Sequence, residues 1–364
     1  MTEKIQTDVL VVGSGPAGSL AARTAAEKGV KVTMIEMRPE VGVPVRCGEL
    51  MPSFQEIVDM FPNLEDAESL FEMPSNLKIC EVEAIRLIDP KMRRWEFPFT
   101  GYTTDRNRFD QYLADQAVSA GAELIKSCRF KKIENGVAKT TIGDIEFKTI
   151  IGADGPGSRV AKSLGLDANK NQYPAVSAQA EGDFEPVVQM FFGGIAPGAY
   201  GWIMPKAGQA NVGVGFSPKF SNGTLREYFD RFTAEHNLNI MTKIEGKYVP
   251  SEGPIKKTYS DIGMVVGDAA GVVMPVNGGG IPQAMITGRM AGEVAADNIL
   301  KNRSIAEYEQ AWREVLYKPL KTAAFNKKLA DTFAFRSEWS TAMCMRILGT
   351  RRMGKLIRCK RIFP

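Results

Sequence analysis

The sequence offers few residues that could ligate a metal or form a disulfide. It contains one histidine, His236, and only five cysteines among 364 residues. The cysteines are widely scattered and form no CxxC pair: Cys47, Cys80, Cys128, Cys344 and Cys359. Because zinc sites need clustered histidine and cysteine ligands, we expect no metal site. An odd number of dispersed thiols also argues against a disulfide framework and favours a reducing, cytoplasmic compartment.

Long hydrophobic runs are also missing. No stretch of about 18 apolar residues occurs, so we expect no transmembrane helix. The N-terminus, MTEKIQTDVLVVG, lacks the basic start and long apolar segment of a signal peptide. What remains is an ordinary globular composition, 44% hydrophobic and 24% charged, with a mean hydropathy of −0.16. This length predicts two domains, or one core with a large insertion.

Charge is distributed unevenly along the chain. Residues 301–364 hold 15 Lys and Arg but 5 Asp and Glu, a net charge of +10, so the first 300 residues carry −6 of the total +4. A basic C-terminal segment fits an anionic partner such as nucleic acid or lipid headgroups, or else a solvated helical surface. Its charges are not interleaved with aromatic residues as in a nucleic-acid module, so we expect no nucleic-acid partner.

The N-terminal residues follow a dinucleotide-binding pattern. An apolar strand at residues 7–12 leads into GSGPAG at 13–18, then a helix pattern at 19–29, a second strand at 30–35, and Glu36. In such a unit the first glycine permits the tight turn, the second lets the backbone approach a pyrophosphate, and the third lets helix and strand pack closely. The helix N-terminus binds the phosphates, and Glu36 accepts the ribose hydroxyls. The acid disfavours a 2′-phosphate, so FAD and NAD fit this motif.

Two later segments carry further turns of this kind. IIGADGPGSR at 150–159 ends a strand and places Asp154 before a short helix. DIGMVVGDAAGVVMPVNGGG at 261–280 contains a strand at 262–266, Asp268, and a glycine cluster before a helix at 282–299. An aspartate in this position can bind ribityl hydroxyls, and the helix N-terminus can stabilise negative charge on a reduced flavin.

In order, these motifs resemble the aromatic-hydroxylase-like FAD superfamily. The resemblance implies FAD bound in an extended form along one Rossmann-type domain, with a β-sheet substrate domain over the flavin. Arg106, within TTDRNRFDQYL, matches the arginine that opens a helix near the FAD in that superfamily. Read without the resemblance, Arg106 is an exposed charge at a helix start.

Two more local features narrow the family. GVPVRCGE at 42–49 places Cys47 in a loop after the nucleotide unit, and YGWIMPK at 200–206 is followed by Gly213. Tyr200 and Trp202 share one strand face, which lines an apolar cavity or joins the core. Alternating glycines in ANVGVGFS predict that something approaches that strand closely, an elongated apolar substrate being one candidate.

Together these features are similar to the geranylgeranyl reductase family, which has a Y-x-W-x-F-P-K-x6-G pattern and a cysteine in a related loop. Met204 replaces the usual aromatic residue, which leaves an apolar pocket but changes its shape. The resemblance covers nearly the whole chain, is greatest for the archaeal digeranylgeranylglycerophospholipid reductases, and extends to the branch that acts on chlorophyll or polyprenyl precursors. It implies hydrogenation of isoprenoid double bonds by hydride transfer from reduced FAD plus protonation.

The expected fold is α/β: a Rossmann-type FAD-binding domain, an antiparallel β-sheet substrate domain and a basic helical C-terminal segment. We assign residues 1–75, 101–165 and 258–300 to the first, 76–100 and 166–257 to the second, and 301–364 to the third. The expected FAD contacts are Gly13, Gly15, Ala17, Gly18, Glu36, Arg46, Cys47, Gly48, Arg106, Asp154, Asp268, Gly279, Gly280 and Ile281. The expected substrate contacts are Tyr200, Trp202, Pro205 and Gly213.

Several alternatives stay open. Cys47 either donates a proton beside the flavin, shapes the substrate end of the cavity, or is a small packing residue. The electron donor is ferredoxin or NAD(P)H. The last fifteen residues either bind an anionic membrane peripherally, at the inner face of the cell membrane, or pack their apolar face against the FAD domain. A flavin monooxygenase of a hydrophobic substrate is the main rival activity. A flavin halogenase, which would want a W-x-W pair, and a lipid carrier fit less well.

Overall fold

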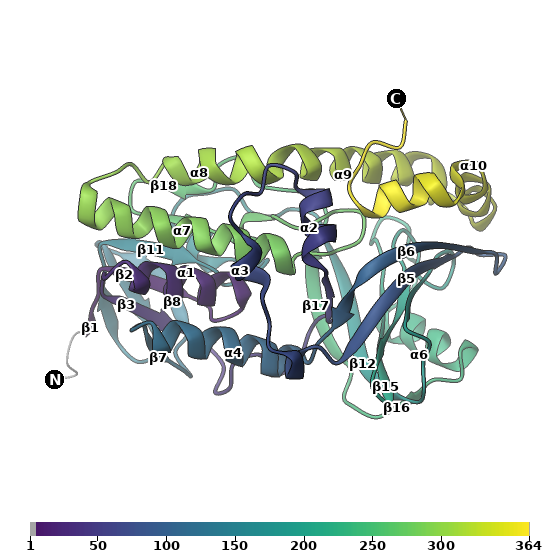
Figure 1. Cartoon of the computed structure of the whole chain (residues 1–364), viewed down its shortest axis with the longest axis horizontal. Helices are drawn as coiled ribbons and strands as arrows, with labels where there is room; N and C mark the ends of the chain where they lie inside the picture. Colours follow the sequence, from purple (N-terminus) through teal and green to yellow (C-terminus); the bar gives the residue numbers. More distant parts are fainter. Residues whose placement is uncertain (1–4, 364) are drawn as a thin grey trace.

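The computed structural model describes residues 5–363, arranged around two large sheets with a helical layer along one side (Figure 1). The first sheet contains the two strands of the predicted dinucleotide-binding unit. The second sheet contains strands whose residues were expected to bind substrate. Helices α7, α8 and α9 run along the upper edge in Figure 1, and α10 lies above β5 and β6. Segments far apart in sequence therefore meet where the two sheets adjoin.

The first sheet has six strands in the order β18-β19-β11-β2-β3-β7, parallel except for the β18–β19 pair. Its central strands β2 and β3 are fully buried, as expected for apolar strands in the middle of a parallel sheet. The strands are β18 (Tyr259–Ser260), β19 (Gly263–Val265), β11 (Thr149–Gly152), β2 (Val9–Val12), β3 (Val32–Ile35) and β7 (Glu123–Ile125).

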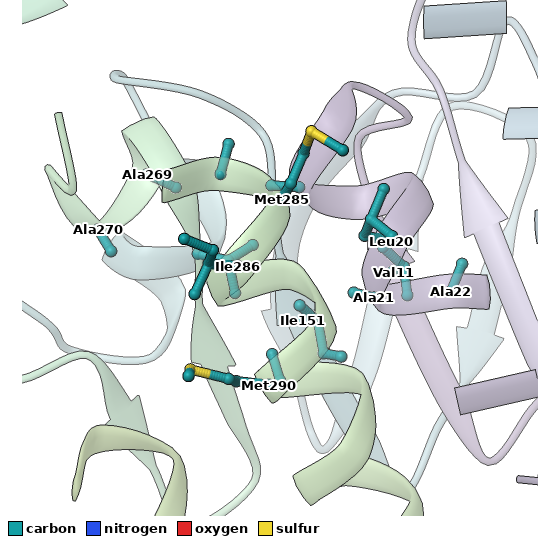
Figure 2. Close-up of a cluster of buried hydrophobic side chains, with 14 of the residues drawn as sticks. Val11, Leu20, Ala21, Ala22, Ile151, Ala269, Ala270, Met285, Ile286 and Met290 are labelled. Atoms are coloured by element: carbon teal, nitrogen blue, oxygen red, sulfur yellow. The ribbon is translucent and has the colours of Figure 1, made fainter. Parts of the chain in front are cut away.

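Two helices pack closely on this sheet. In Figure 2, Ala21 of α1 (Pro16–Glu27) and Ile286 of α7 (Ile281–Lys301) lie with Ile151 of β11 in one apolar cluster. Small residues bring the helix backbones together: a Cβ on Gly288 would lie 2.2 Å from the carbonyl oxygen of Ala17, which a real side chain cannot do. The α7 N-terminus is thereby held beside the α1 N-terminus.

The second sheet has nine strands and is antiparallel apart from the parallel pair β13–β5. Its order is β16-β12-β15-β14-β13-β5-β6-β4, with β17 paired to β12. β4 belongs to this sheet although residues 1–75 were assigned to the FAD-binding domain, because the chain returns to pair with β6. The strands are β16 (Asn239–Ile240), β12 (Gln172–Glu181), β15 (Gln209–Gly215), β14 (Gly201–Lys206), β13 (Val187–Phe191), β5 (Cys80–Ile88), β6 (Arg94–Thr103), β4 (Leu50–Pro52) and β17 (Glu245–Pro250).

Smaller elements complete the two lobes. A four-stranded sheet has the order β1-β10-β9-β8, and α4 opens at Arg106 as expected. These elements are β1 (Ile5–Gln6), β10 (Asp144–Glu146), β9 (Val137–Thr140), β8 (Phe130–Glu134), α2 (Phe54–Met60), α3 (Glu68–Phe71), α4 (Arg106–Ser119), α5 (Arg159–Ser163), α6 (Leu225–Glu235), and the short 3₁₀ turns η1 (Ser75–Leu77) and η2 (Gly267–Ala270).

The C-terminal segment is a nearly continuous helical path. It consists of α8 (Glu307–Trp312), the π-helical segment η3 (Arg313–Tyr317), α9 (Lys318–Leu329), the π-helical segment η4 (Ala330–Ala334) and α10 (Glu338–Ile357). Pro319 does not interrupt this path, because proline is tolerated in the first turn of α9. Gly349, at φ 63°, kinks α10. No helix within residues 5–363 is long and apolar enough to cross a bilayer.

The apolar face of the final residues packs on the nine-stranded sheet. Met353 and Ile357 are buried in a core cluster with Phe97 and Phe99 of β6. Arg358 is also held there, donating two hydrogen bonds of 2.6 and 2.7 Å to Glu56. Packing on the FAD domain was one of two alternatives for these residues. The contacts are shared: Met353 and Ile357 lie against the second sheet, whereas Cys359 lies in the core cluster of the first sheet.

Candidate active site

Two cavities meet at the Cys47 loop. The first, which we call the nucleotide cleft, has a volume of about 690 Å³ and runs past the carboxyl ends of β2 and β3. The second, the apolar cavity, has a volume of about 220 Å³ and lies against the nine-stranded sheet. Both are lined by Arg46, Cys47, Lys247, Gly280 and Ile281. A group bound in the cleft could therefore reach a molecule bound in the apolar cavity.

The glycine turn forms a cradle at the start of α1. Gly13 has φ +101°, and a Cβ there would lie 2.4 Å from the carbonyl oxygen of Ala153. A Cβ on Gly18 would lie 1.8 Å from the carbonyl oxygen of Gly13, so helix and turn are in direct contact. Around Gly15, in contrast, no atom lies within 4 Å of the Cβ position. Open space at a helix N-terminus suits a pyrophosphate, so these residues fit the dinucleotide of FAD.

Glu36 lies at the end of β3 in the same cleft. One oxygen of its carboxylate accepts hydrogen bonds from the Ser14 backbone at 3.1 Å and hydroxyl at 2.9 Å, and the other accepts from the Arg38 backbone at 3.0 Å. These bonds fix the carboxylate where it would meet the ribose of a dinucleotide. Burial and the nearby Arg46 lower the pKa of Arg38, which also lines the cleft.

Arg106 lines the nucleotide cleft. Its guanidinium donates to both oxygens of Asp110 at 2.9 and 3.0 Å. Burial acts to lower the pKa of Arg106, but Asp110 and the Cys47 thiol group outweigh it and raise that pKa. Arg106 is therefore a fixed cation beside Cys47, held by a partner that the sequence analysis missed.

Two aspartates expected to contact FAD have different partners. Asp154 accepts from the Ser158 hydroxyl at 2.6 Å and the Arg159 backbone at 2.7 Å, so it caps α5. Burial raises the pKa of Asp154, with these hydrogen bonds opposing the effect. Asp268 forms a 2.7 Å ion pair with Lys247 of β17. Both aspartates line the cleft, and Lys247 was not anticipated.

The start of α7 closes the cleft. Gly280 is its N-cap and offers no side-chain hydrogen bond, which leaves the first backbone N–H groups of α7 without a side-chain cap. Gly279, Gly280 and Ile281 line the apolar cavity, and the last two also line the cleft. The positive end of this helix thus faces the junction of the two cavities.

The Cys47 loop joins the nucleotide domain to the nine-stranded sheet. The half-buried Cys47 thiol accepts a hydrogen bond from the Glu49 backbone N–H at 3.2 Å. The backbone carbonyl oxygen of Cys47 accepts one from the Asn211 side chain at 2.9 Å. Gly48 lets the loop pass close to β14, since a Cβ there would lie 2.7 Å from the Met204 sulfur. Burial acts to lower the pKa of Lys247, but Asp268 and Cys47 outweigh this effect and raise that pKa. Cys47 therefore faces two cations, Arg106 and Lys247.

A buried polar network underlies this loop. Glu49 is only 1% exposed, and its carboxylate accepts from Gln179 at 2.7 Å and Asn211 at 2.9 Å. It also accepts from the Lys206 ammonium at 3.3 Å, and Lys206 forms a second ion pair with Asp105. Glu49 is the last residue of the GVPVRCGE motif and Lys206 is the last residue of YGWIMPK, so the motifs could have pointed to this ion pair. No motif pointed to Gln179 or Asn211.

The apolar cavity is built from strands of the second sheet. Tyr200 and Trp202 line it, as expected, together with Met204, Val188 and Met190. The Tyr200 hydroxyl donates to the Asn277 carbonyl oxygen, and burial raises the pKa of Tyr200. The Trp202 indole donates to Asn211 at 2.8 Å.

Two expected substrate contacts do not line this cavity. A Cβ on Gly213 would lie 2.2 Å from the Trp202 ring, so what approaches this glycine closely is the indole and not a substrate. Pro205 lies further along β14, where its carbonyl oxygen accepts from the Thr103 hydroxyl at 2.6 Å. At the other end the cavity reaches Lys327 and Phe335 of the helical segment, which were not anticipated.

Comparison with known proteins agrees with this arrangement. Residues 6–192 match the FAD binding domain family, and residues 171–248 match the geranylgeranyl reductase catalytic domain. The chain is 35% identical to a digeranylgeranylglycerophospholipid reductase of Methanocaldococcus jannaschii, covering 89% of this chain and 86% of that protein. It is also 35% identical to one from Methanosarcina acetivorans, covering 84% and 80%.

Solved structures give the same result. A geranylgeranyl bacteriochlorophyll reductase-like protein from Thermoplasma acidophilum superposes with a TM-score of 0.80 at 30% identity, covering 90% of this chain and 88% of that one. The flavin-dependent brominase Bmp2 superposes with a TM-score of 0.70 at 18% identity, covering 97% and 92%, a likeness of fold alone.

Proposed function

The chain belongs to the geranylgeranyl reductase family, and we propose on this premise that it is an FAD-dependent reductase acting on CH–CH bonds. Its substrates are the isoprenoid double bonds of geranylgeranyl chains, carried by 2,3-digeranylgeranylglycerophospholipids in archaeal membrane lipid biosynthesis. The observation that carries the proposal is the junction at Cys47. There a cleft suited to FAD meets a cavity walled by aromatic and aliphatic side chains.

The apolar cavity suits an isoprenoid chain. Tyr200, Trp202 and Met204 line one wall of it, and the burial of Trp202 and Met204 excludes water from a bound alkene. FAD, when bound and reduced, supplies a hydride to the alkene. An isolated alkene accepts hydride poorly, so a proton must reach the other carbon of the double bond at nearly the same time.

Cys47 is the proposed proton donor. Its sulfur lies at the junction of the two cavities, where it could reach an alkene. Arg106 and Lys247 line the cleft beside Cys47, so two cationic side chains lie near the sulfur. The other roles open to Cys47, shaping the substrate end of the cavity or serving as a small packing residue, require no proton transfer.

Two substitutions separate these roles. If Cys47 donates the proton, Cys47→Ala should lower the rate of lipid reduction about 100-fold or more while FAD content stays unchanged. Cys47→Ser keeps the size but is a weaker acid, so its rate should also fall. Single-turnover reduction of a geranylgeranyl lipid measures both. Unchanged rates in both variants would remove Cys47 from the mechanism.

Mass spectrometry tests the proposed reaction itself. The FAD-loaded protein is reduced with dithionite under anaerobic conditions and mixed with a geranylgeranyl phospholipid. The reductase predicts a gain of about 2 Da for each double bond reduced. Oxygen-dependent gain of about 16 Da would support the rival FAD-dependent monooxygenase instead. Reduction of a chlorophyll or polyprenyl precursor, but not of the phospholipid, would point to the other branch of the family.

The electron donor is proposed to be ferredoxin or NAD(P)H. The sequence contains one evident dinucleotide fingerprint, GSGPAG, which the FAD would occupy. Flavin bleaching by each donor under anaerobic conditions discriminates between them. Because the lipid substrate resides in a bilayer, we also propose that the protein works in the cytoplasm and binds the inner face of the cell membrane peripherally.

A further inference from the structure

Most of the large apolar side chains with the highest exposure lie on consecutive helical elements of the C-terminal segment. Among residues 5–363, five such side chains are at least 60% exposed. Four lie on α9, η4 and α10, and we call them the aromatic helix surface: Phe325 (60%), Phe333 (61%), Trp339 (63%) and Ile347 (62%). The fifth, Met92, is next to Arg93, whose guanidinium donates to the Ala342 carbonyl oxygen of α10 at 3.0 Å.

We propose that the aromatic helix surface docks on a bilayer of anionic phospholipid. The inference rests on the proposed function and deepens it by assigning the surface that meets the membrane. Single exposed apolar residues are common on soluble proteins, but a group within 23 residues marks a contact surface. Phe325 and Phe333 are about two turns apart on one helical path, and the same spacing separates Trp339 from Ile347 on α10.

Charge on the same helices favours an anionic partner. Lys328, Arg336, Arg346 and Arg351 are exposed, and none forms an ion pair within the described part of the chain. Unpaired cations of this kind are attracted to the negative surface of an anionic bilayer.

The carboxylates of this stretch are already engaged. Asp331 pairs with Lys327, and the Glu338 carboxylate accepts from the Gly194 backbone at 3.1 Å. The surface therefore combines apolar rings with uncompensated positive charge, which fits lipid headgroups better than an uncharged protein surface.

The surface also adjoins the apolar cavity. Phe335 and Lys327 lie on the same helical path as Phe325 and Phe333, and both line the cavity that ends at Cys47. The Lys327 ammonium donates to the Tyr173 hydroxyl at 2.7 Å, on the same cavity wall. An isoprenoid tail leaving a bilayer at this surface would have a direct path to the reaction site.

The last fifteen residues do not provide this surface. Their apolar side chains Met353, Ile357, Cys359 and Ile362 are buried against the protein. Among residues 350–363, Phe363, 49% exposed, is the one large apolar side chain in the exposed class. The basic residues of the tail can add charge attraction, but the apolar contact must come from α9, η4 and the first part of α10.

Tryptophan fluorescence gives a local test. Trp339 is 63% exposed, whereas Trp202 and Trp312 are buried and Trp95 is partly buried. Adding vesicles of phosphatidylglycerol and phosphatidylcholine should shift the emission to shorter wavelength, and brominated lipid should quench it. Pure phosphatidylcholine vesicles should do so at least tenfold less effectively. Trp339→Phe should remove most of the quenching without abolishing co-sedimentation.

A triple variant tests the surface as a whole. Phe325→Ser, Phe333→Ser and Trp339→Ser together should weaken co-sedimentation with the anionic vesicles at least tenfold. The matched control replaces three exposed apolar residues elsewhere and should bind as the parent does: Val118→Ser, Ile142→Ser and Met241→Ser. FAD content and thermal midpoint confirm that both variants are folded.

Three outcomes would overturn the proposal. These are absence of vesicle binding by the parent, equal binding by the triple variant and the control, and a parent dimer that only the triple variant converts to monomer. The last would assign the surface to a second copy of the chain. Reduction of a detergent-dispersed geranylgeranyl lipid separates this test from the proposed function. The triple variant should retain that activity, and its absence in the parent would reject the function whatever the vesicles show.

Discussion

At the scale of single residues, Asn211 connects the two parts of the site. Its amide nitrogen donates to the Cys47 carbonyl oxygen and to Glu49, and its oxygen accepts from the Trp202 indole. One buried side chain thus positions both the proposed proton donor and the cavity wall. Because each bond is inside the protein, losing the amide would leave buried polar groups without partners.

Replacing this amide should affect both stability and the cavity. Asn211→Leu should lower the free energy of unfolding by about 2–3 kcal/mol and slow lipid reduction, because Trp202 and the Cys47 loop lose their shared anchor. Urea unfolding and single-turnover reduction measure the two effects. Asn239→Leu, at an exposed amide with one bond to Glu181, should change stability by less than about 0.5 kcal/mol. Equal effects from both would show that Asn211 has no special role.

Neighbouring glycines of β15 provide a second comparison. A Cβ at Gly213 would lie 2.2 Å from the Trp202 ring, so Gly213→Ala should cost about 1–3 kcal/mol of unfolding free energy and displace the ring. At Gly215 the nearest atom is 3.5 Å from the Cβ position, an ordinary contact. Gly215→Ala should therefore be neutral or stabilise by up to about 1 kcal/mol. Thermal unfolding measures both variants, and equal thermal midpoints for Gly213→Ala and Gly215→Ala would contradict this account.

The single histidine predicts one feature of pH dependence. Burial lowers the pKa of His236 below its ordinary 6.5, where its ring packs on Phe191 and Phe232 with centroids 4.3 and 4.9 Å away. The unfolded chain then binds a proton before the folded one as pH falls. Its contribution to stability is full above pH 6.5 and is lost as pH falls through 6.5 towards the folded pKa.

Urea unfolding at several pH values between about 7.5 and 5.5 tests this, because the imidazole of the unfolded chain titrates in that range. The free energy of unfolding should fall towards the acid side in the parent, and less steeply in His236→Gln. Identical slopes in the two proteins would show that the histidine is not the cause.

At the scale of elements, the contact between α1 and α7 holds both helix N-termini at the nucleotide cleft. Gly288 and Gly292 bring α7 against the carbonyl oxygens of Ala17 and Ala21. Without that close approach, the start of α7 would move away from the junction of the two cavities.

Gly288→Ala tests this contact. Alanine is intrinsically the better helix former by about 1 kcal/mol, but its Cβ would lie 2.2 Å from the Ala17 carbonyl oxygen. We expect a net loss of about 1–3 kcal/mol in unfolding free energy and weaker FAD binding. The temperature at which flavin is released on heating should fall, because it depends on both the stability of the fold and FAD binding. Glu293→Ala, on an accessible position of α7, should leave FAD binding unchanged.

Much of the nucleotide unit was predictable because its chemistry is local. The order of strand, Gly13, Gly15 and Gly18, helix and strand appears in the sequence as it does in the fold. The close approach predicted for the glycine strand is present at Gly213, but the sequence did not identify the group that approaches, because it is the Trp202 ring of a neighbouring strand. Asn211 and Gln179 could not be predicted, since they reach Glu49 only once distant strands pair.

At the scale of the whole molecule, two sheets of different kinds supply the two halves of a reaction site. The mostly parallel sheet provides the glycine turn and helix N-termini of the cleft, as is usual for cofactor sites in such sheets. The mainly antiparallel sheet provides the apolar wall. The helical segment runs along the upper side of the molecule (Figure 1). It also carries the aromatic helix surface.

The central claim is that a cofactor in the cleft reduces a lipid in the apolar cavity. Anaerobic single turnover tests it most directly: the FAD-loaded protein is reduced by one equivalent of dithionite and mixed with digeranylgeranylglycerophospholipid, while flavin absorbance and lipid mass are followed together. The account predicts that the oxidised flavin spectrum returns as one double bond per flavin is reduced, with a gain of about 2 Da. Flavin that stays reduced until oxygen is admitted, with no lipid hydrogenation, would contradict it.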